Sequence, residues 1–190
     1  MNDSPIRCFV AFDLPSEAKT FILSIIKKNQ VRLPQARWVP PDQIHITLQF
    51  FPALFPPQVH QIKMFIQNFF PEVASFQSTL TEIGVFSSWN RVRVVWLGFD
   101  YQASEIMKKA AQILNEECLK QGITVDLTRP FSPHLTLARF KNPVSIFPQQ
   151  LYQPPCYTTF IQQVSFYQST LTPRGPIYTP LITTPLKEVK

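Results

Sequence analysis

The stretch HITLQF, residues 45–50, has a counterpart in HLTLARF, residues 134–140, and this pair decides how the chain is expected to fold. Residues i and i+2 of a β-strand point to the same face of the sheet. The histidine of each stretch therefore shares one face with the threonine that follows it, roughly 7 Å away along the strand. The apolar residues take the opposite face and are expected to pack in a core. The four polar side chains are His45, Thr47, His134 and Thr136.

Around these two stretches, the spacing of apolar residues predicts a mixture of strands and helices. Helices are expected to begin near Ser16, with Ser16 or Asp13 as N-cap, and at Pro56, and a third is expected from Tyr101 to Gln121, followed by Gly122 as C-cap. Strands are expected over residues 7–13, 43–51, 76–86, 91–99, 133–140, 159–170 and 176–183. Turn signals over residues 87–90 and 172–175 indicate hairpins, and a surface loop is expected over residues 142–155.

These hairpins favour an α+β fold with antiparallel sheets over a doubly wound parallel sheet. The two matched stretches lie near one quarter and three quarters of the chain length. That placement predicts two lobes related by a pseudo-twofold axis, each contributing one imidazole and one hydroxyl to a shared cleft. Residues 1–190 are accordingly expected to form a single bilobal domain.

The composition narrows the class of protein. The chain has 190 residues, of which 45% are hydrophobic and 16% are charged, so it is expected to fold around a sizeable core. Its three cysteines lack CxxC spacing, which argues against a zinc site and favours reduced thiols in the cytoplasm. The chain shows no signal-peptide pattern at its start and no run of about 20 apolar residues, so no membrane association is expected. A net charge of +6 favours anionic partners but equally fits an ordinary basic protein.

Two imidazoles and two hydroxyls around one cleft suit phosphoryl transfer. A neutral imidazole can take a proton from an attacking water, and a protonated imidazole can give one to a departing oxygen. Threonine hydroxyls can donate hydrogen bonds to the non-bridging phosphate oxygens. Two histidines without a nearby carboxylate or cysteine are a poor zinc set, so neither a metal nor another cofactor is expected.

A single His-x-Thr pattern on a strand is common and most often marks a surface or core histidine. Two copies on similar apolar backgrounds favour a functional interpretation. The third histidine, His60, lies in a helical pattern and is expected at the solvated surface.

The two stretches resemble the paired HxTx motifs of the 2H phosphoesterases. Further segments, in the same order, resemble the bacterial and archaeal RNA 2′,3′-cyclic phosphodiesterases, once called 2′-5′ RNA ligases. These segments are RCFVAFDLPSE, RWVPPDQIHITLQFF, IGVFSSWNRVRVVWLGF, RPFSPHLTLARF and FYQSTLTPRGPIYTPL. The resemblance implies a bilobal α+β fold with a central cleft between two antiparallel sheets. It also implies metal-independent hydrolysis of a 2′,3′-cyclic phosphate to a 2′-phosphomonoester.

The resemblance assigns His45 and His134 as the catalytic pair, with His45 as the acid and His134 as the base. It assigns Thr47, Thr136 and Arg139 to the phosphate. Strand parity alone turns Arg139 away from His134, so its assignment requires a bulge, and the alternative is a solvated surface arginine.

The chain departs from the resembled pattern after the first motif, where Phe50-Phe51-Pro52 replaces the usual Phe-Leu-Gly. Proline lacks the backbone freedom of glycine, so the following loop is expected to differ. Four aromatic residues near the motifs could stack a base but are more often core residues. They are Phe9, Phe12, Trp38 and Phe131.

The expected partners are RNA ends or nucleotides that carry a 2′,3′-cyclic phosphate, bound by a monomer. The same residues are compatible with 2′-5′ RNA ligation and with hydrolysis of a small cyclic nucleotide. A non-catalytic RNA-binding module on the same fold is a further alternative, against which the intact histidines and threonines argue.

Overall fold

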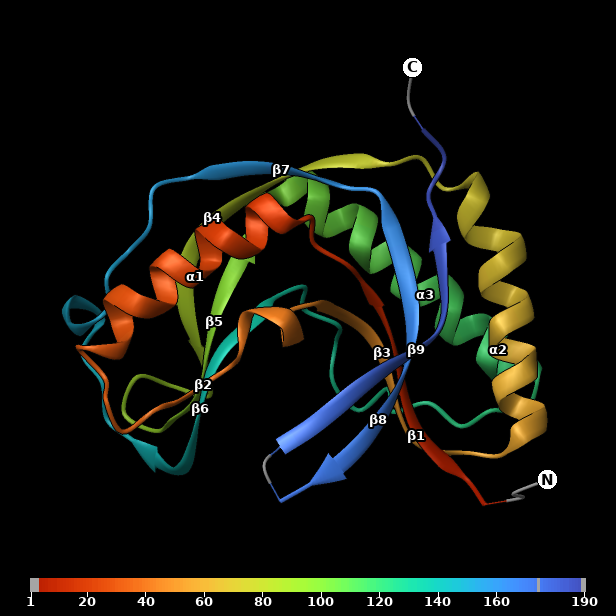
Figure 1. The fold of residues 1–190 in the computed structure, drawn as a ribbon, viewed down its shortest axis with the longest axis horizontal. Coiled ribbons are helices and arrows are strands. Elements are labelled where there is room, and N and C mark those ends of the chain that lie inside the picture. Colours follow the sequence, from red (N-terminus) through yellow and green to blue (C-terminus); the bar gives the residue numbers. More distant parts are fainter. Residues whose placement is uncertain (1–3, 174, 189–190) are drawn as a thin grey trace.

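The computed structural model describes residues 4–173 and 175–188, and these form two antiparallel β-sheets flanked by α-helices (Figure 1). The first sheet has the strand order β3-β1-β8-β9 and the second has the order β2-β6-β5-β4-β7. Strands of the first sheet are β1 (Ile6–Phe12), β3 (Ile46–Leu54), β8 (Gln163–Thr172) and β9 (Gly175–Pro185). Strands of the second are β2 (Arg37–Trp38), β4 (Phe76–Phe86), β5 (Val92–Phe99), β6 (Leu135–Val144) and β7 (Tyr157–Ile161).

The helices lie outside the sheets (Figure 1). They are α1 (Ser16–Gln30), α2 (Pro56–Phe69) and α3 (Tyr101–Lys120), with short 3₁₀ helices η1 (Pro41–Gln43), η2 (Phe70–Glu72) and η3 (Pro148–Gln150). Helix α3 ends one residue earlier than expected, and its C-cap is Gln121 rather than Gly122. Gly122 follows the cap and adopts a φ of 72°, which glycine tolerates without a steric penalty.

The two sheets repeat one topology, which confirms the predicted α+β class and its pseudo-twofold relation. In the first sheet, β1 leads through α1 to β3, which pairs antiparallel with β1. In the second, β5 leads through α3 to β6, which pairs antiparallel with β5. The next neighbours correspond as well, since β8 and β9 continue from β1 as β4 and β7 continue from β5.

The helices tie the two sheets together. Helix α1 follows a strand of the first sheet but contacts β7 of the second, and α3 follows a strand of the second sheet but contacts β3 of the first. The buried side chains form one contiguous hydrophobic cluster. Phe12 is fully buried and meets Phe70 and Phe76 edge-on, at ring-centroid distances of 5.9 and 5.5 Å. The two matched motifs are thereby fixed on separate sheets that share a core.

Several element boundaries differ from the predictions. The strand expected over residues 159–170 is two strands in different sheets, because the chain crosses from β7 to β8 at Gln162 without a glycine or proline to mark the crossing. The expected loop over residues 142–155 contains the end of β6 and η3, and the two-residue β2 was not predicted. Of the predicted turn at residues 172–175, Arg174 lies outside the described residues.

Candidate active site

Each motif histidine lies just before a strand rather than within one. His45 precedes β3 and His134 precedes β6, so the predicted strands at residues 43–51 and 133–140 begin later than expected. At the first, η1 holds the backbone until Gln43. Both histidines are held by the same local contact: Nδ1 of His45 lies 2.7 Å from the Gln43 carbonyl oxygen, and Nδ1 of His134 lies 2.8 Å from that of Ser132.

This contact fixes the proton arrangement of both rings. A carbonyl oxygen only accepts hydrogen bonds, so Nδ1 must carry a proton and donate it. In the neutral imidazole, Nε2 is then the unprotonated nitrogen and the only ring atom able to accept or release a proton. The two halves of the molecule therefore present the same ring nitrogen for acid–base chemistry.

A β-bulge follows each motif threonine. In the first sheet, Val10 pairs with Gln49 whereas the next residue, Ala11, pairs with Thr47, so β3 has one extra residue at Leu48. The second sheet repeats this shift at Leu137, because β5 pairs successively with Ala138 and Thr136 of β6. A bulge reverses the alternation of side chains beyond it.

The second bulge explains why Arg139 faces the cleft despite its sequence parity. Arg139 lies three residues after Thr136, and its Nη2 is 3.5 Å from the Thr136 hydroxyl oxygen. The corresponding position after Thr47 is Phe50, which also lines the cleft. The alternation of strand residues, without a bulge, would have placed both side chains on the opposite face.

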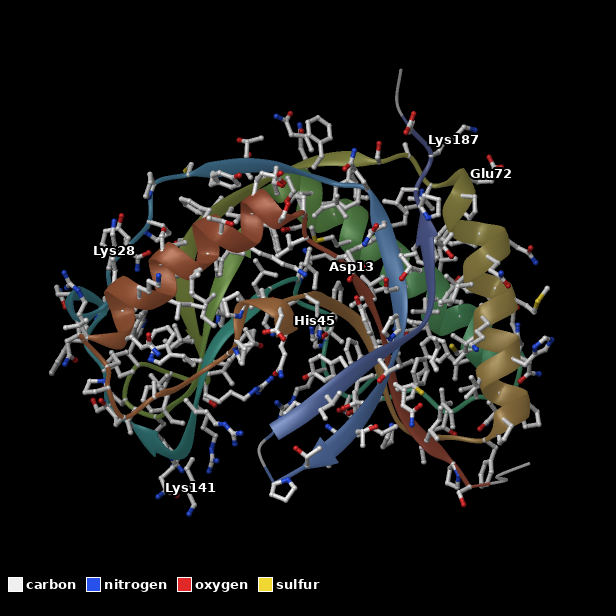
Figure 2. All side chains as sticks on the ribbon, viewed as in Figure 1. Asp13, Lys28, His45, Glu72, Lys141 and Lys187 are labelled. Atoms are coloured by element: carbon white, nitrogen blue, oxygen red, sulfur yellow. The ribbon has the colours of Figure 1, made fainter. Side chains whose placement is uncertain are left out.

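A cleft with a volume of about 600 Å³ brings all five predicted site residues together. It is lined from both sheets, and Figure 2 shows His45 near the middle of the molecule. The predicted residues in its lining are His45, Thr47, His134, Thr136 and Arg139. Phe9 and Trp38, which were expected in the core, also line the cleft. The rest of the lining was not assigned to the site from the sequence and consists of Arg7, Arg37, Val39, Pro40, Gln43, Phe50, Ser169, Gly175, Pro176 and Tyr178. His60, by contrast, is exposed on α2 as expected.

Aromatic rings enclose His45. Phe9 stacks on its imidazole with a centroid distance of 4.5 Å, and Tyr178 meets it edge-on at 5.4 Å. Burial lowers the pKa of His45 to about 4, an effect opposed by the Gln43 carbonyl and by the negative charge of Asp13. The positive charges of Lys19 and Arg139 lower the pKa of His45 further.

His134 has a simpler setting. Its ring meets Phe86 edge-on at 4.8 Å. Burial lowers its pKa, the Ser132 carbonyl opposes that shift, and Arg139 adds to it. Among residues 4–173 and 175–188, no carboxylate contributes to the pKa shift of His134, whereas Asp13 does contribute to that of His45. This asymmetry distinguishes the two halves chemically.

Asp13 is the main site-related residue that sequence reasoning placed wrongly. It does not cap α1, whose N-cap is Pro15 and whose first helical residue is Ser16. Its side chain is 6% exposed and points instead to β8, where Tyr167 donates to its Oδ1 at 2.7 Å and Ser165 and Gln163 donate to its Oδ2. Figure 2 shows it near His45. Tyr167 also stacks on Phe9 at 5.1 Å, so Asp13 supports the aromatic wall behind His45.

The corresponding residue of the second half is Asp100, which follows β5 as Asp13 follows β1. Asp100 does cap its helix: its Oδ1 accepts from the Ala103 backbone N–H at 2.9 Å, and its Oδ2 accepts from that of Thr79 at 2.6 Å. The sequence signal that relates the two residues is the Phe-Asp pair at residues 12–13 and 99–100. The repeated Phe-Asp pair indicates that the two positions correspond. It does not indicate that Asp100 caps a helix whereas Asp13 accepts hydrogen bonds from β8.

A second cavity of about 520 Å³ lies between β3, α3 and the segment before β6. Phe131 and Arg129 line it, so neither belongs to the central cleft. Within residues 4–173 and 175–188, no group of three or more His, Cys, Asp or Glu side chains is arranged to hold a metal ion. Across the same residues, no helix is long and apolar enough to cross a membrane.

Comparison with known proteins finds that the chain is similar to phosphoesterases of one kind. A family model described as LigT like phosphoesterase matches residues 14–96. The RNA 2′,3′-cyclic phosphodiesterase of Methanothermobacter thermautotrophicus is 28% identical over 179 residues, covering 92% of this chain and 95% of that protein. The protein of the same name from Thermotoga maritima is 29% identical over 185 residues, covering 91% of both.

Solved structures agree with the sequence comparison. The crystal structure of Escherichia coli LigT complexed with 3′-AMP is 26% identical and aligns with a TM-score of 0.81. That alignment covers 96% of this chain and 98% of LigT.

Proposed function

The chain belongs to the LigT-like phosphoesterases of the 2H phosphoesterase superfamily, and on this premise we propose that it is an RNA 2′,3′-cyclic phosphodiesterase that leaves a 2′-phosphomonoester. The observation that supports this proposal most strongly is the matched pair of histidines, His45 and His134. Both bond through Nδ1 to a backbone carbonyl, and both line one cleft from opposite sheets. Similar proteins that bear this activity in their names support the assignment.

The proposed reaction breaks the bond between phosphorus and the 3′ oxygen. Water attacks phosphorus opposite that oxygen, so the base and the acid must lie on opposite sides of the phosphate. His134 Nε2 takes a proton from the attacking water, while His45 Nε2–H gives a proton to the departing 3′ oxygen. One proton is taken up and one is released, and proton exchange with solvent restores the starting protonation states.

The remaining residues hold the phosphate. The Thr47 and Thr136 hydroxyls donate hydrogen bonds to the non-bridging oxygens, where negative charge resides in the transition state. Arg139 adds a charge-assisted contact from the Thr136 side, as its position 3.5 Å from that hydroxyl supports. The phosphodiester anion also raises the pKa of both histidines when it enters, which offsets the lowering by burial and permits His45 to be protonated.

The wider setting follows the same proposal. Residues 1–190 act as one catalytic domain and as a monomer in the cytoplasm, on RNA ends that carry a 2′,3′-cyclic phosphate. The free thiols of Cys8, Cys118 and Cys156 support a reducing compartment.

Incubation with a short RNA that ends in a 2′,3′-cyclic phosphate, in the presence of EDTA, tests the proposal. The expected product carries a 2′-phosphate, which is identified by its chromatographic retention against 2′- and 3′-phosphate standards. A 3′-phosphate product would contradict the proposed bond cleavage. Activity that is abolished by EDTA and restored by a divalent ion would contradict the two-histidine mechanism.

A further inference from the structure

Building on the proposed function, we propose that Arg7 and Phe50 form a second phosphate subsite, which binds the phosphodiester that precedes the terminal nucleotide. The enzyme would thereby select RNA chains over mononucleoside cyclic phosphates. The subsite is on the first sheet, where Arg7 belongs to β1 and Phe50 to β3. Both side chains line the central cleft.

The pseudo-twofold relation allows the position of Arg139 in the second sheet to be compared with its counterpart in the first. Phe50 occupies the position that Arg139 occupies in the second sheet, three residues beyond the motif threonine and past an equivalent bulge. The first half therefore lacks an arginine at this position. Arg7, from the neighbouring strand, places its guanidinium 4.4 Å from the centre of the Phe50 ring.

This stacking prepares Arg7 for a phosphate. The ring supports one face of the planar guanidinium, while the N–H groups around its edge stay available for a bidentate contact. Among residues 4–173 and 175–188, no carboxylate forms an ion pair with Arg7. Phe50 is 37% exposed and lines the cleft, so its ring and the guanidinium on it are open to a ligand.

The position of Arg7 suits the next phosphate rather than the reacting one. Along β1, Arg7 and Phe9 share a face, and Phe9 stacks on His45. The Cα of Arg7 therefore lies two residues, or roughly 7 Å along the strand, from that of Phe9, whose ring covers His45. That displacement is comparable to one backbone step of a nucleic acid strand.

Tyr178 lines the same cleft as the two cationic groups, Arg7 and Arg139. Burial raises the pKa of Tyr178, and the positive charges of Arg139 and Arg7 oppose that shift. The proposed function assigns Thr47, Thr136 and Arg139 to the reacting phosphate, which leaves the charge on Arg7 in the same cleft without an assigned ligand. A second negative group of the substrate is the ligand that matches it.

Three substrates distinguish this role. The first is a nucleoside 2′,3′-cyclic phosphate, the second is a dinucleotide with a 3′-terminal 2′,3′-cyclic phosphate, and the third is that dinucleotide with an uncharged methylphosphonate linkage. Arg7→Gln is expected to lower kcat/KM for the charged dinucleotide about tenfold and to change the other two less than twofold. Arg32→Gln is the matched control. Arg32 is exposed just beyond α1 and does not line the cleft, so this substitution removes the same charge from another part of the surface.

Fluorescence anisotropy with a labelled oligonucleotide that carries a 2′-phosphate gives a second readout, independent of turnover. There, too, Arg7→Gln should weaken binding about tenfold and Arg32→Gln should not. An equal loss on all three substrates, or no loss on any, would overturn the subsite. A wild-type protein that binds the oligonucleotide through Arg7 but cleaves none of the substrates would instead contradict the proposed function alone.

Discussion

The two halves of the molecule share a topology but not a chemical environment. His45 is enclosed by Phe9 and Tyr178, and the charge of Asp13 raises its pKa, whereas His134 meets Phe86 and no carboxylate in the described part of the chain affects its pKa. The repeated features are the ones that aim the rings, namely the carbonyl contact at Nδ1 and the bulge after the threonine.

The comparison shows that the backbone features around the two histidines are symmetric, whereas the side chains around them are not. A reaction with an attacking and a departing oxygen needs two proton-transfer groups placed symmetrically about phosphorus. It also needs them in opposite protonation states, which identical surroundings would not favour. The carbonyl contacts at Nδ1 hold the two rings alike, and the side chains packed around each histidine make their surroundings unlike, which is the difference that the proposed mechanism requires.

The largest expected effect comes from removing either histidine. His45→Ala and His134→Ala should each reduce kcat about 10²–10⁴-fold on an RNA cyclic phosphate, since each removes a general acid or base. A substrate with a nitrophenyl leaving group separates the two roles, because this group departs with little need of a proton. Its hydrolysis should be largely restored in His45→Ala and should remain low in His134→Ala.

His60→Ala provides a control for these measurements, since it removes an exposed imidazole from α2. Its activity should equal that of the wild type on both substrates. Restoration of nitrophenyl ester hydrolysis in His134→Ala alone would reverse the two roles. An equal loss in both variants would show that neither histidine acts simply as the acid.

A smaller loss of activity is expected from changing the residues assigned to the phosphate, which are Arg139, Thr47 and Thr136. Arg139→Gln should lower kcat/KM about 10- to 100-fold, because it removes a charge-assisted bond to the phosphate. Arg139→Lys should lie between Arg139→Gln and the wild type, since lysine keeps the charge but loses the planar fork. Thr47→Ala and Thr136→Ala should each cost about tenfold, as one hydrogen bond is lost while proton transfer survives.

Steady-state kinetics on one cyclic phosphate substrate gives these values together. Phe50, which replaces the arginine in the first half, provides the internal comparison, since Phe50→Leu removes no charge and should leave hydrolysis of a mononucleoside cyclic phosphate nearly unchanged. A variant Arg139→Gln with wild-type kcat/KM would return Arg139 to the solvated-surface interpretation.

The sequence was sufficient to predict that the histidines and threonines line a cleft together, because each His-Thr pair is a local signal. Alternation in a strand places His45 with Thr47 and His134 with Thr136 wherever the strands lie. The same rule was wrong for Arg139, because the bulge at Leu137 is set by pairing with β5 and leaves no mark in the motif. Long-range pairing of this kind also explains the missed split between β7 and β8.

Residues supplied by other strands were beyond sequence reasoning for the same reason. Arg7 and Tyr178 join the cleft only because β1 and β9 lie in the same sheet as β3. Asp13 was expected as a possible helix cap, since an aspartate before a helix commonly caps it. Its partners Ser165 and Tyr167 are more than 150 residues away, and nothing in the first segment indicates them.

The smallest expected effect on rate comes from the pair of equivalent aspartates, and it is the one that tests the asymmetry directly. Asp13→Asn removes a negative charge that raises the pKa of His45, so that pKa should fall. If His45 is the acid, it must be protonated to react. The basic limb of the kcat profile should therefore move to lower pH, with a several-fold loss at neutral pH and little loss on the acidic side.

Asp100→Asn is the matched control. It removes an equivalent charge, but the new amide must place its NH₂ group against the backbone N–H of either Thr79 or Ala103. The expected result is a loss of about 1–3 kcal/mol in the free energy of unfolding with an unchanged pH profile. Chemical denaturation measures the former, and NMR titration of the His45 ring reports the pKa shift in each variant.

The sign of the Asp13 effect is what separates an electrostatic role from a purely structural one. Tyr167 keeps its proton at neutral pH, because burial and the hydrogen bond to Asp13 raise its pKa to about 12. It can therefore still donate to an asparagine oxygen. The Ser165 hydroxyl can rotate, and the Gln163 side-chain amide can turn its oxygen inward, so that both accept from the new NH₂ group. The wall behind His45 should survive, and Lys19 and Arg139 would then act on the imidazole unopposed by Asp13. A uniform loss of activity at every pH would mean that Asp13 only supports the fold. An acidic limb displaced to lower pH, with the basic limb unchanged, would mean that His45 is the base.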